Sequence, residues 1–189
     1  MLDTMLEPSE LANVVLRPVR RNEYYRMAEL GFFEDERVEL LGGVIVKMSP
    51  IGPPHAGIEA LLNEHLVKAL PSHLIVRPNL PIALSDISEP EPDLAIVPRT
   101  KATDDHPSNA LLLIEISDSS LAKDRGIKAK LYADAGVPDY WVIDVNAMTI
   151  EVYRDPAGTG YRSVERHDAS TRVTALRIPE VTVCLADLL

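Results

Sequence analysis

Apolar and polar positions alternate along the chain in blocks that predict helices and strands in succession. The most apolar block, residues 110–116, is almost continuously hydrophobic, which is typical of a central strand buried on both faces. A second buried strand is expected over residues 140–145. Between them, apolar positions at helical spacing predict a helix that begins at Ser119 or Ser120 and ends at Ala135. A strand, a helix and a strand in this order predict a right-handed crossover in a mixed sheet.

The rest of the pattern places further helices and strands around this unit. Gly42 and Gly43 separate two β-rich runs and predict a tight hairpin, and Asn22 is the expected cap of the first helix. We expect helices over residues 23–30 and 55–70, and extended segments over 37–41, 44–48, 74–84, 93–97, 149–154, 161–166 and 173–183. The segment over 74–84 is expected to form one or two strands, interrupted by Pro78 and Pro81. The predicted fold class is α/β (α+β), a mixed central sheet flanked by helices, with added hairpins near both ends. Residues 1–18 are expected to form an N-terminal arm and residues 19–189 a single domain.

Composition excludes several classes of protein. The 189 residues are 46% hydrophobic and carry a formal charge of −10, which excludes a disordered chain and argues against generic nucleic-acid coating. A single cysteine, Cys184, excludes an internal disulfide and any Cys-rich zinc site. No apolar run reaches the ~20 residues of a membrane helix, and no signal peptide is recognisable, so a cytoplasmic location is expected. Phosphate-loop, dinucleotide-binding, serine-hydrolase and zincin motifs are absent from the sequence.

Glu115 breaks the apolar pattern most sharply. It lies inside the most apolar stretch of the chain, where a carboxylate must be paired, neutralised or bound to a metal. Because side chains alternate along a strand, Glu115 and Ser117 are expected on the same face of the sheet. Metal-binding or catalytic use is favoured over the alternative, a salt bridge to an Arg or Lys at the end of the strand.

Lys128 breaks the pattern of the helix that follows. At 100° per residue, Asp124, Lys128 and Tyr132 fall on the stripe that packs against the sheet. Lys123 and Lys130 fall on the opposite side. A catalytic lysine and a purely structural Asp124–Lys128 pair at i,i+4 spacing are both consistent with this helix taken alone.

Other polar candidates carry less information by themselves. Asp93 opens a short strand among prolines and is more often a turn residue; it gains weight only if its strand lies beside that of Glu115. His55 and Glu59 are spaced i,i+4 at the start of a helix, where His55 either points into a cleft or binds local backbone. Glu39 lies in the first hairpin and faces either inward or outward.

Taken together, these residues resemble the PD-(D/E)XK nuclease pattern, and more specifically the Uma-two family of restriction-endonuclease-like proteins. The resemblance covers nearly the whole chain beyond about residue 18, and residues 124–144 are its most specific part. The matching segments are Glu39-Leu40-Leu41-Gly42-Gly43, Met48-Ser49-Pro50, His55, Glu91-Pro92-Asp93, Glu115-Ile116-Ser117, Asp124-Arg125-Gly126, Lys128, Tyr132 and Ala135-Gly136-Val137-Pro138-Asp139-Tyr140-Trp141-Val142-Ile143-Asp144.

The resemblance implies a nuclease-like core with its site at one edge of the sheet. Asp93 and Glu115 would bind a divalent cation, Mg²⁺ or Mn²⁺. Ser117 stands where the parent pattern has its lysine, and Lys128 matches the lysine that the family supplies from the next helix. Glu39 and His55 match the family's upstream acid and histidine. The helical count singles out Lys128 independently of the family.

These features predict a Mg²⁺-dependent DNA endonuclease, with Asp93, Glu115, Lys128, His55 and Glu39 as catalytic candidates. DNA is the expected partner, and its non-specific binding is expected to be weak because the chain is acidic. A homodimer is expected because cutting two strands with one site per chain favours a two-fold pair. The alternatives are a catalytically inert nuclease-fold module that acts through protein contacts, and a metal-binding domain with another phosphoester substrate.

Overall fold

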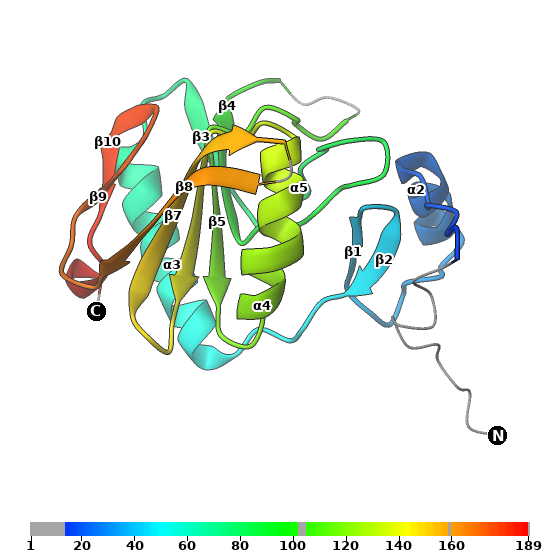
Figure 1. Ribbon diagram of the computed structural model, residues 1–189, viewed down its shortest axis with the longest axis horizontal. Coiled ribbons are helices and arrows are strands. Elements are labelled where there is room, and N and C mark those ends of the chain that lie inside the picture. The colour runs from blue at the N-terminus through cyan, green and yellow to red at the C-terminus, as the bar shows by residue number, and fades with distance from the viewer. Residues whose placement is uncertain (1–13, 102–104, 159, 189) are drawn as a thin grey trace.

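A mixed six-stranded sheet forms the centre of the molecule (Figure 1). The structure is a computed structural model that describes residues 14–101, 105–158 and 160–188, so most of the expected N-terminal arm lies outside the described residues. The strands are, in spatial order, β3 (Leu74–Pro78), β4 (Leu94–Pro98), β5 (Leu112–Ser117), β6 (Asp139–Asp144), β7 (Thr149–Ala157) and β8 (Gly160–Asp168). Only β5 and β6 pair in parallel within this sheet, and the other neighbours are antiparallel. The predicted mixed sheet is confirmed.

Helices cover both faces of the sheet. The helix α3 (Pro53–Ala69) packs on one face together with β9 (Val173–Ala175) and β10 (Ile178–Val183). The connection from β5 to β6 covers the other face. It consists of α4 (Leu121–Lys123), the π-helical segment η1 (Asp124–Lys128) and α5 (Ala129–Asp134).

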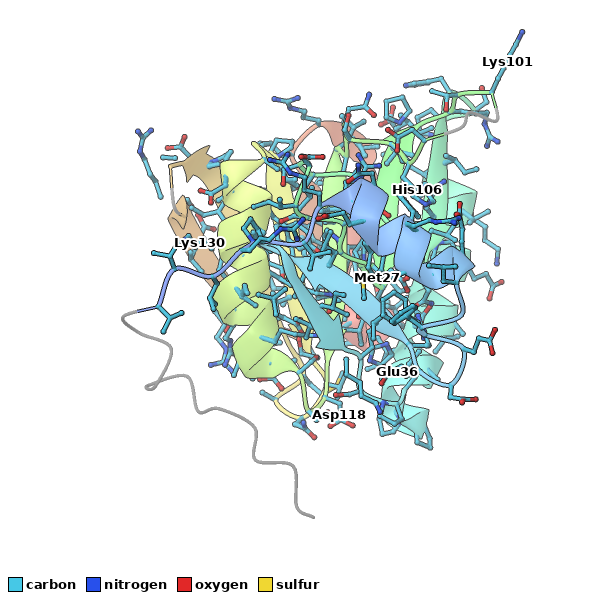
Figure 2. The ribbon with its side chains drawn as sticks, turned by 90° about the vertical axis from the view of Figure 1, so that its right-hand side faces the viewer. Met27, Glu36, Lys101, His106, Asp118 and Lys130 are labelled. Atoms are coloured by element: carbon cyan, nitrogen blue, oxygen red, sulfur yellow. The ribbon has the colours of Figure 1, made fainter. Side chains whose placement is uncertain are left out.

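A smaller unit lies against this second face. It consists of α2 (Arg21–Glu29) and the hairpin of β1 (Val38–Leu41) and β2 (Val44–Lys47). Elsewhere, a 3₁₀ turn, η2 (Leu185–Asp187), follows β10. Figure 2 shows α2 and the hairpin in front of the sheet. None of the helices built from the described residues combines the length and the apolar character that crossing a bilayer requires.

Strand β5 is buried along its whole length, as its apolar sequence predicts. Its even-numbered residues, such as Ile114, belong to the core beneath α3, and Leu113 belongs to the core beneath α5. Strict alternation therefore turns Glu115 and Ser117 toward the side covered by η1 and α5. This placement of a carboxylate under a helix is the starting point of the site.

Local details differ from the sequence pattern in several places. Arg20, not Asn22, caps α2, because the Glu23 side chain accepts a hydrogen bond from the Arg20 backbone N–H at 3.0 Å. The extended segment over residues 74–84 does end as a strand at Pro78, one of its two expected interruptions, and Asn79 follows in a left-handed conformation with φ of 49°. The extended tail over residues 173–183 folds into the β9–β10 hairpin.

Replacing Gly43 with alanine is expected to lower the free energy of unfolding by about 1–3 kcal/mol. Gly43 has φ of +81°, and an added Cβ would lie 2.3 Å from Cβ of Pro18. Gly42→Ala is the matched control, since Gly42 also has a positive φ but has no atom within 4 Å of an added Cβ. Chemical denaturation checks both, and an equal loss in the two variants would show that contact with Pro18 is unimportant.

Candidate functional site

The pairing of β4 with β5 brings two carboxylates to one end of the sheet. Leu94 pairs with Ile114 in this antiparallel register, so Asp93 lies just before the paired region and beside the end of β5. One carboxylate oxygen of Asp93, Oδ2, accepts the backbone N–H of Ile116 at 2.6 Å. The condition that gave Asp93 weight in the sequence, a strand adjacent to that of Glu115, is therefore met.

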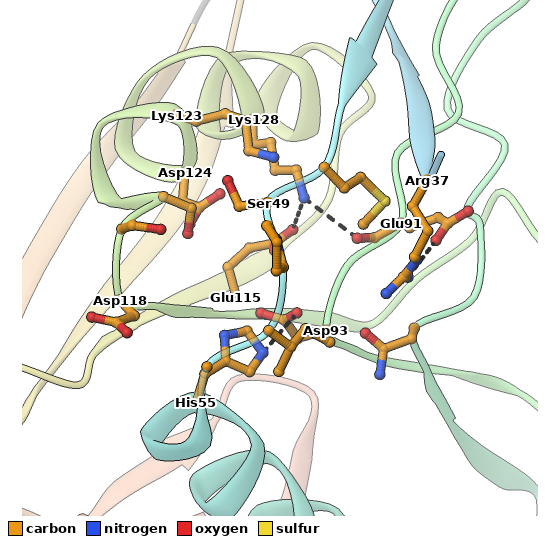
Figure 3. Close-up of a pocket in the computed structure, with 17 residues that line it drawn as sticks. Arg37, Ser49, His55, Glu91, Asp93, Glu115, Asp118, Lys123, Asp124 and Lys128 are labelled. Carbon is orange, nitrogen blue, oxygen red and sulfur yellow. Dashed lines mark hydrogen bonds and ion pairs between the residues drawn. The ribbon is translucent and has the colours of Figure 1, made fainter. Parts of the chain in front are cut away.

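Glu115 is held from above by two side chains of the following helix. Its side chain is 4% exposed, and Oε1 accepts the Lys128 ammonium at 2.9 Å (Figure 3). The same oxygen accepts the Tyr132 hydroxyl at 2.6 Å. Among the described residues no hydrogen bond reaches the other oxygen, Oε2. The carboxylate is thus fixed in orientation with one oxygen available toward the pocket.

Lys128 joins Glu115 to the first hairpin. Its Nζ lies 3.2 Å from Oε2 of Glu39 on β1 and 3.4 Å from the backbone oxygen of Glu91. Glu39 is fully buried, so it faces inward, and it also accepts the Glu91 backbone N–H at 3.3 Å. The hairpin that looked remote in sequence therefore supplies one wall of the site.

The helical count is wrong for Lys123. It placed Lys123 with Lys130 on the solvent side, and Figure 2 shows Lys130 at the outer surface. Lys123, however, reaches Oε1 of Glu39 at 2.8 Å. The cause is the π-helical segment from Asp124 to Lys128, whose wider turn breaks the constant rotation of 100° per residue on which the count depends.

Asp124 plays a different part from the one its spacing predicts. Instead of pairing with Lys128, its Oδ2 accepts hydroxyl hydrogen bonds from Ser117 at 2.7 Å and Ser120 at 2.5 Å. Its Oδ1 is buried and has no hydrogen-bond partner within the described part of the chain. Ser117, at the position where the parent pattern has a lysine, thus fixes a third carboxylate at the site.

His55 approaches from the opposite face, at the start of α3. Its Nε2 lies 3.2 Å from Oδ1 of Asp93 and 3.5 Å from Oε2 of Glu59, so the predicted i,i+4 proximity is confirmed. Figure 3 shows the imidazole directed at Asp93. Burial lowers the pKa of His55, and the neighbouring carboxylates of Asp93, Glu59 and Asp124 raise it by more.

The charges at the site are not balanced by its lysines. Burial raises the pKa of Glu115 well above its usual range, Lys128 opposes this shift, and Asp124, Asp93 and Glu39 add to it. Burial lowers the pKa of Lys128, but Glu115, Glu39 and Asp124 raise it by more, so the lysine stays protonated. A divalent cation would remove the penalty for ionising Glu115.

All five residues proposed from the sequence meet at this place, and four of them line one pocket of about 60 Å³ (Figure 3). Glu39 lies behind its wall, in contact with Lys123 and Lys128. The lining residues are Arg37, Met48, Ser49, Pro50, Ile51, Gly52, His55, Asn79, Glu91, Asp93, Glu115, Asp118, Ser119, Ser120, Lys123, Asp124 and Lys128. Most of the side-chain atoms that are free to coordinate a metal are carboxylate oxygens, and such hard ligands suit Mg²⁺ or Mn²⁺. The residues present therefore fit a divalent cation.

Most of the other basic residues near the site are engaged elsewhere. Arg20 pairs with Asp86, and Arg21 pairs with Glu89 and Asp105. Arg125 makes two hydrogen bonds to Glu151, at 2.6 and 2.9 Å. The positive side chains that line the pocket are Lys123, Lys128 and Arg37, the last paired with Glu91 at 3.0 Å.

Removing the Tyr132 hydroxyl in Tyr132→Phe is expected to lower the free energy of unfolding by about 1.5–3 kcal/mol, because its acceptor is a carboxylate. Tyr161→Phe is the control, since the Tyr161 hydroxyl donates to a neutral acceptor, the Val137 carbonyl, at 3.0 Å. About 0.5–1.5 kcal/mol is expected there. Urea denaturation compares them, and a smaller loss in Tyr132→Phe than in Tyr161→Phe would contradict the role given to this hydroxyl.

Comparisons with known proteins agree with the fold and with the sequence resemblance. A sequence profile of the Uma2 family, described as "Putative restriction endonuclease", matches residues 21–186. The fold is similar to a crystal structure from Anabaena variabilis ATCC 29413 described as "a putative nuclease belonging to DUF820". That chain is 18% identical, with a TM-score of 0.68 over 90% of this chain and 97% of the other. None of the curated proteins compared with the chain matches it.

Proposed function

The chain belongs to the Uma2 family of restriction-endonuclease-like proteins, and from this premise we propose that it is a Mg²⁺-dependent DNA endonuclease. The observation that carries the proposal is the convergence of Asp93 and Glu115, from adjacent strands, with the buried Lys128 from the following helix. A buried acid, a second acid beside it and a protonated lysine are the groups that metal-dependent phosphodiester hydrolysis requires.

Asp93 and Glu115 are the residues that would hold the cation. Each carboxylate has one oxygen fixed by hydrogen bonds, Asp93 by the backbone of Ile116 and Glu115 by Tyr132 and Lys128. Such fixed partners orient ligands before an ion binds. A bound Mg²⁺ or Mn²⁺ supplies Lewis acidity toward a phosphodiester oxygen and lowers the pKa of a bound water.

The remaining side chains act around the reacting phosphate. Hydrolysis adds a water molecule across one P–O bond, the water oxygen attacking phosphorus while the leaving oxygen takes a proton. The Lys128 ammonium stabilises the negative charge that develops on the phosphoryl oxygens, and Glu39 holds Lys128 in place. His55 is near enough to Asp93 to orient it.

DNA is the proposed substrate, and a homodimer the proposed form that cuts both strands. The formal charge of −10 and the engagement of most basic side chains in ion pairs favour weak, salt-sensitive binding outside the pocket. Sequence-specific contacts, not general electrostatic attraction, would then have to supply the affinity for a cleavage site.

The proposal is tested by incubating metal-free protein with supercoiled, linear and single-stranded DNA. We expect nicked or linear products after Mg²⁺ or Mn²⁺ is added, and no products when EDTA is present. Asp93→Asn is expected to abolish the products, and Asp134→Asn, an exposed acid at the end of α5, to leave them unchanged. Uncut DNA of every form with both ions would contradict the proposal and favour an inert nuclease-fold module.

A further inference from the structure

We propose that His55, Glu59 and Asp93 bind a second divalent cation, one that their nitrogen donor tunes toward Mn²⁺ and away from Mg²⁺. The inference rests on the proposed function only in that Asp93 is shared between this ion and the one held with Glu115. Nothing in the family resemblance assigns Glu59 a role, and sequence reasoning named it only as a neighbour of His55.

The distances between the three donors match those around one ion. One ligand atom from each residue lies within 4.8 Å of the others, and Nε2 of His55 is 3.2 Å from Asp93 Oδ1 and 3.5 Å from Glu59 Oε2. Two neighbouring ligands of an octahedral ion with bonds of about 2.1 Å lie about 3 Å apart. Only a small contraction separates the present arrangement from a coordination shell.

The second oxygen of each carboxylate is already held by a donor outside the cluster. Asn79 donates its side-chain N–H to Oε1 of Glu59, and the Ile116 backbone N–H binds Oδ2 of Asp93. The free oxygens, Oε2 and Oδ1, are the two that face His55. Outer partners that fix ligand orientation in this way are typical of metal sites.

The histidine nitrogen is placed for coordination and has no hydrogen bond of its own. Nε2 of His55 is buried and has no hydrogen-bond partner in the ranges that the structure describes. An imidazolium that merely bridged two carboxylates would align its N–H with one of them. Here Nε2 lies 3.2 Å from Asp93 and 3.5 Å from Glu59 without a hydrogen bond to either, and a cation bound by all three residues would receive its lone pair.

Surroundings and access also favour a cation. Two partly buried carboxylates share the space, with exposed side-chain fractions of 14% for Glu59 and 13% for Asp93. Their mutual repulsion favours a positive charge between them. His55, Asn79 and Asp93 also line the pocket that contains Glu115, so an ion can enter from the same opening.

The donor set indicates which ion binds. Mg²⁺ strongly prefers oxygen ligands, whereas Mn²⁺, a transition-metal ion, accepts an imidazole nitrogen more readily than Mg²⁺ does. The site that contains Glu115 offers oxygens, and the site that contains His55 offers one nitrogen and two oxygens. A sufficient excess of Mg²⁺ should therefore displace Mn²⁺ from the site that contains Glu115 before it displaces Mn²⁺ from the site that contains His55.

The experiment titrates the metal-free, full-length protein with Mn²⁺ alone, counting bound ions by calorimetry and by the loss of the free-ion electron paramagnetic signal. We expect two ions in the wild type and one in Glu59→Gln. Glu64→Gln, an exposed acid on the same helix, is the matched control and should keep two. Pulsed electron paramagnetic resonance of the bound Mn²⁺ should show coupling to a ligand nitrogen, and this coupling should be lost in His55→Ala.

The outcomes separate this proposal from the proposed function. One ion in the wild type, lost in Glu115→Gln and kept in Glu59→Gln without nitrogen coupling, would overturn the second site and leave the proposed function intact. One ion lost only in Glu59→Gln would instead remove Glu115 from the metal site. Circular dichroism and thermal unfolding of each variant exclude loss of fold as the cause of lost binding.

Discussion

Lys128→Met is expected to lower the free energy of unfolding by about 3–5 kcal/mol, because it leaves buried carboxylates without their cation. Lys128 is 2% exposed and lies 2.9 Å from Glu115 and 3.2 Å from Glu39. Metal-dependent DNA cleavage should be lost in the same variant. Urea denaturation of metal-free protein measures the first effect, and plasmid cleavage measures the second.

A double variant separates the two effects of this lysine. In Glu115→Gln/Lys128→Met one buried acid is neutralised together with the lysine, so much of the lost stability should return. Cleavage should not return, because both the metal ligand and the ammonium are then absent. If the double variant were less stable than Lys128→Met, the ion pair would not be the reason for the loss.

Glu115→Gln is expected to reduce metal-dependent cleavage by at least about 1,000-fold, since loss of an ion's ligand removes several kcal/mol of transition-state stabilisation. The fold should remain intact. Because burial raises the pKa of Glu115 above its unfolded value, the stability this group contributes at low pH is lost as the pH rises. The free energy of unfolding of the metal-free wild type should therefore decrease relative to that of Glu115→Gln as the pH rises above 4.5, the ordinary pKa of this group.

Cleavage rates at saturating Mg²⁺ and melting temperatures between pH 5 and 8 check this prediction. Glu180→Gln, at an exposed position of β10, serves as the control and should match the wild type in both measurements. A stability difference between Glu115→Gln and the wild type that shrank with rising pH would contradict the role given to burial.

The central unit of the fold was predictable because its signals are local. Continuous hydrophobicity identified β5 and β6, and helical spacing identified the helix between them. Glu115 was recognisable because a carboxylate inside so apolar a strand needs a specific partner. Lys128 was recognisable because it occupies the inward stripe of its helix, and it does contact Glu115.

Other parts of the site depend on contacts between distant segments. Whether Glu39 faces inward depends on how the first hairpin packs against α4 and η1, which supply Lys123 and Lys128, and local pattern carries no information on this. Asp93 gained meaning only from the antiparallel pairing of β4 with β5. Lys123 was misplaced because the π-helical turn has no clear signal in the sequence.

In the proposed mechanism, Asp93 and Glu115 together hold the divalent cation, and Lys128 assists the hydrolysis of DNA by a water molecule. The most direct test is the rate of plasmid nicking in Mg²⁺ by the wild type, Asp93→Asn, Glu115→Gln and the control Asp134→Asn, purified side by side. We expect nicking by the wild type and Asp134→Asn alone. Nicking by Asp93→Asn or Glu115→Gln at the wild-type rate would contradict it.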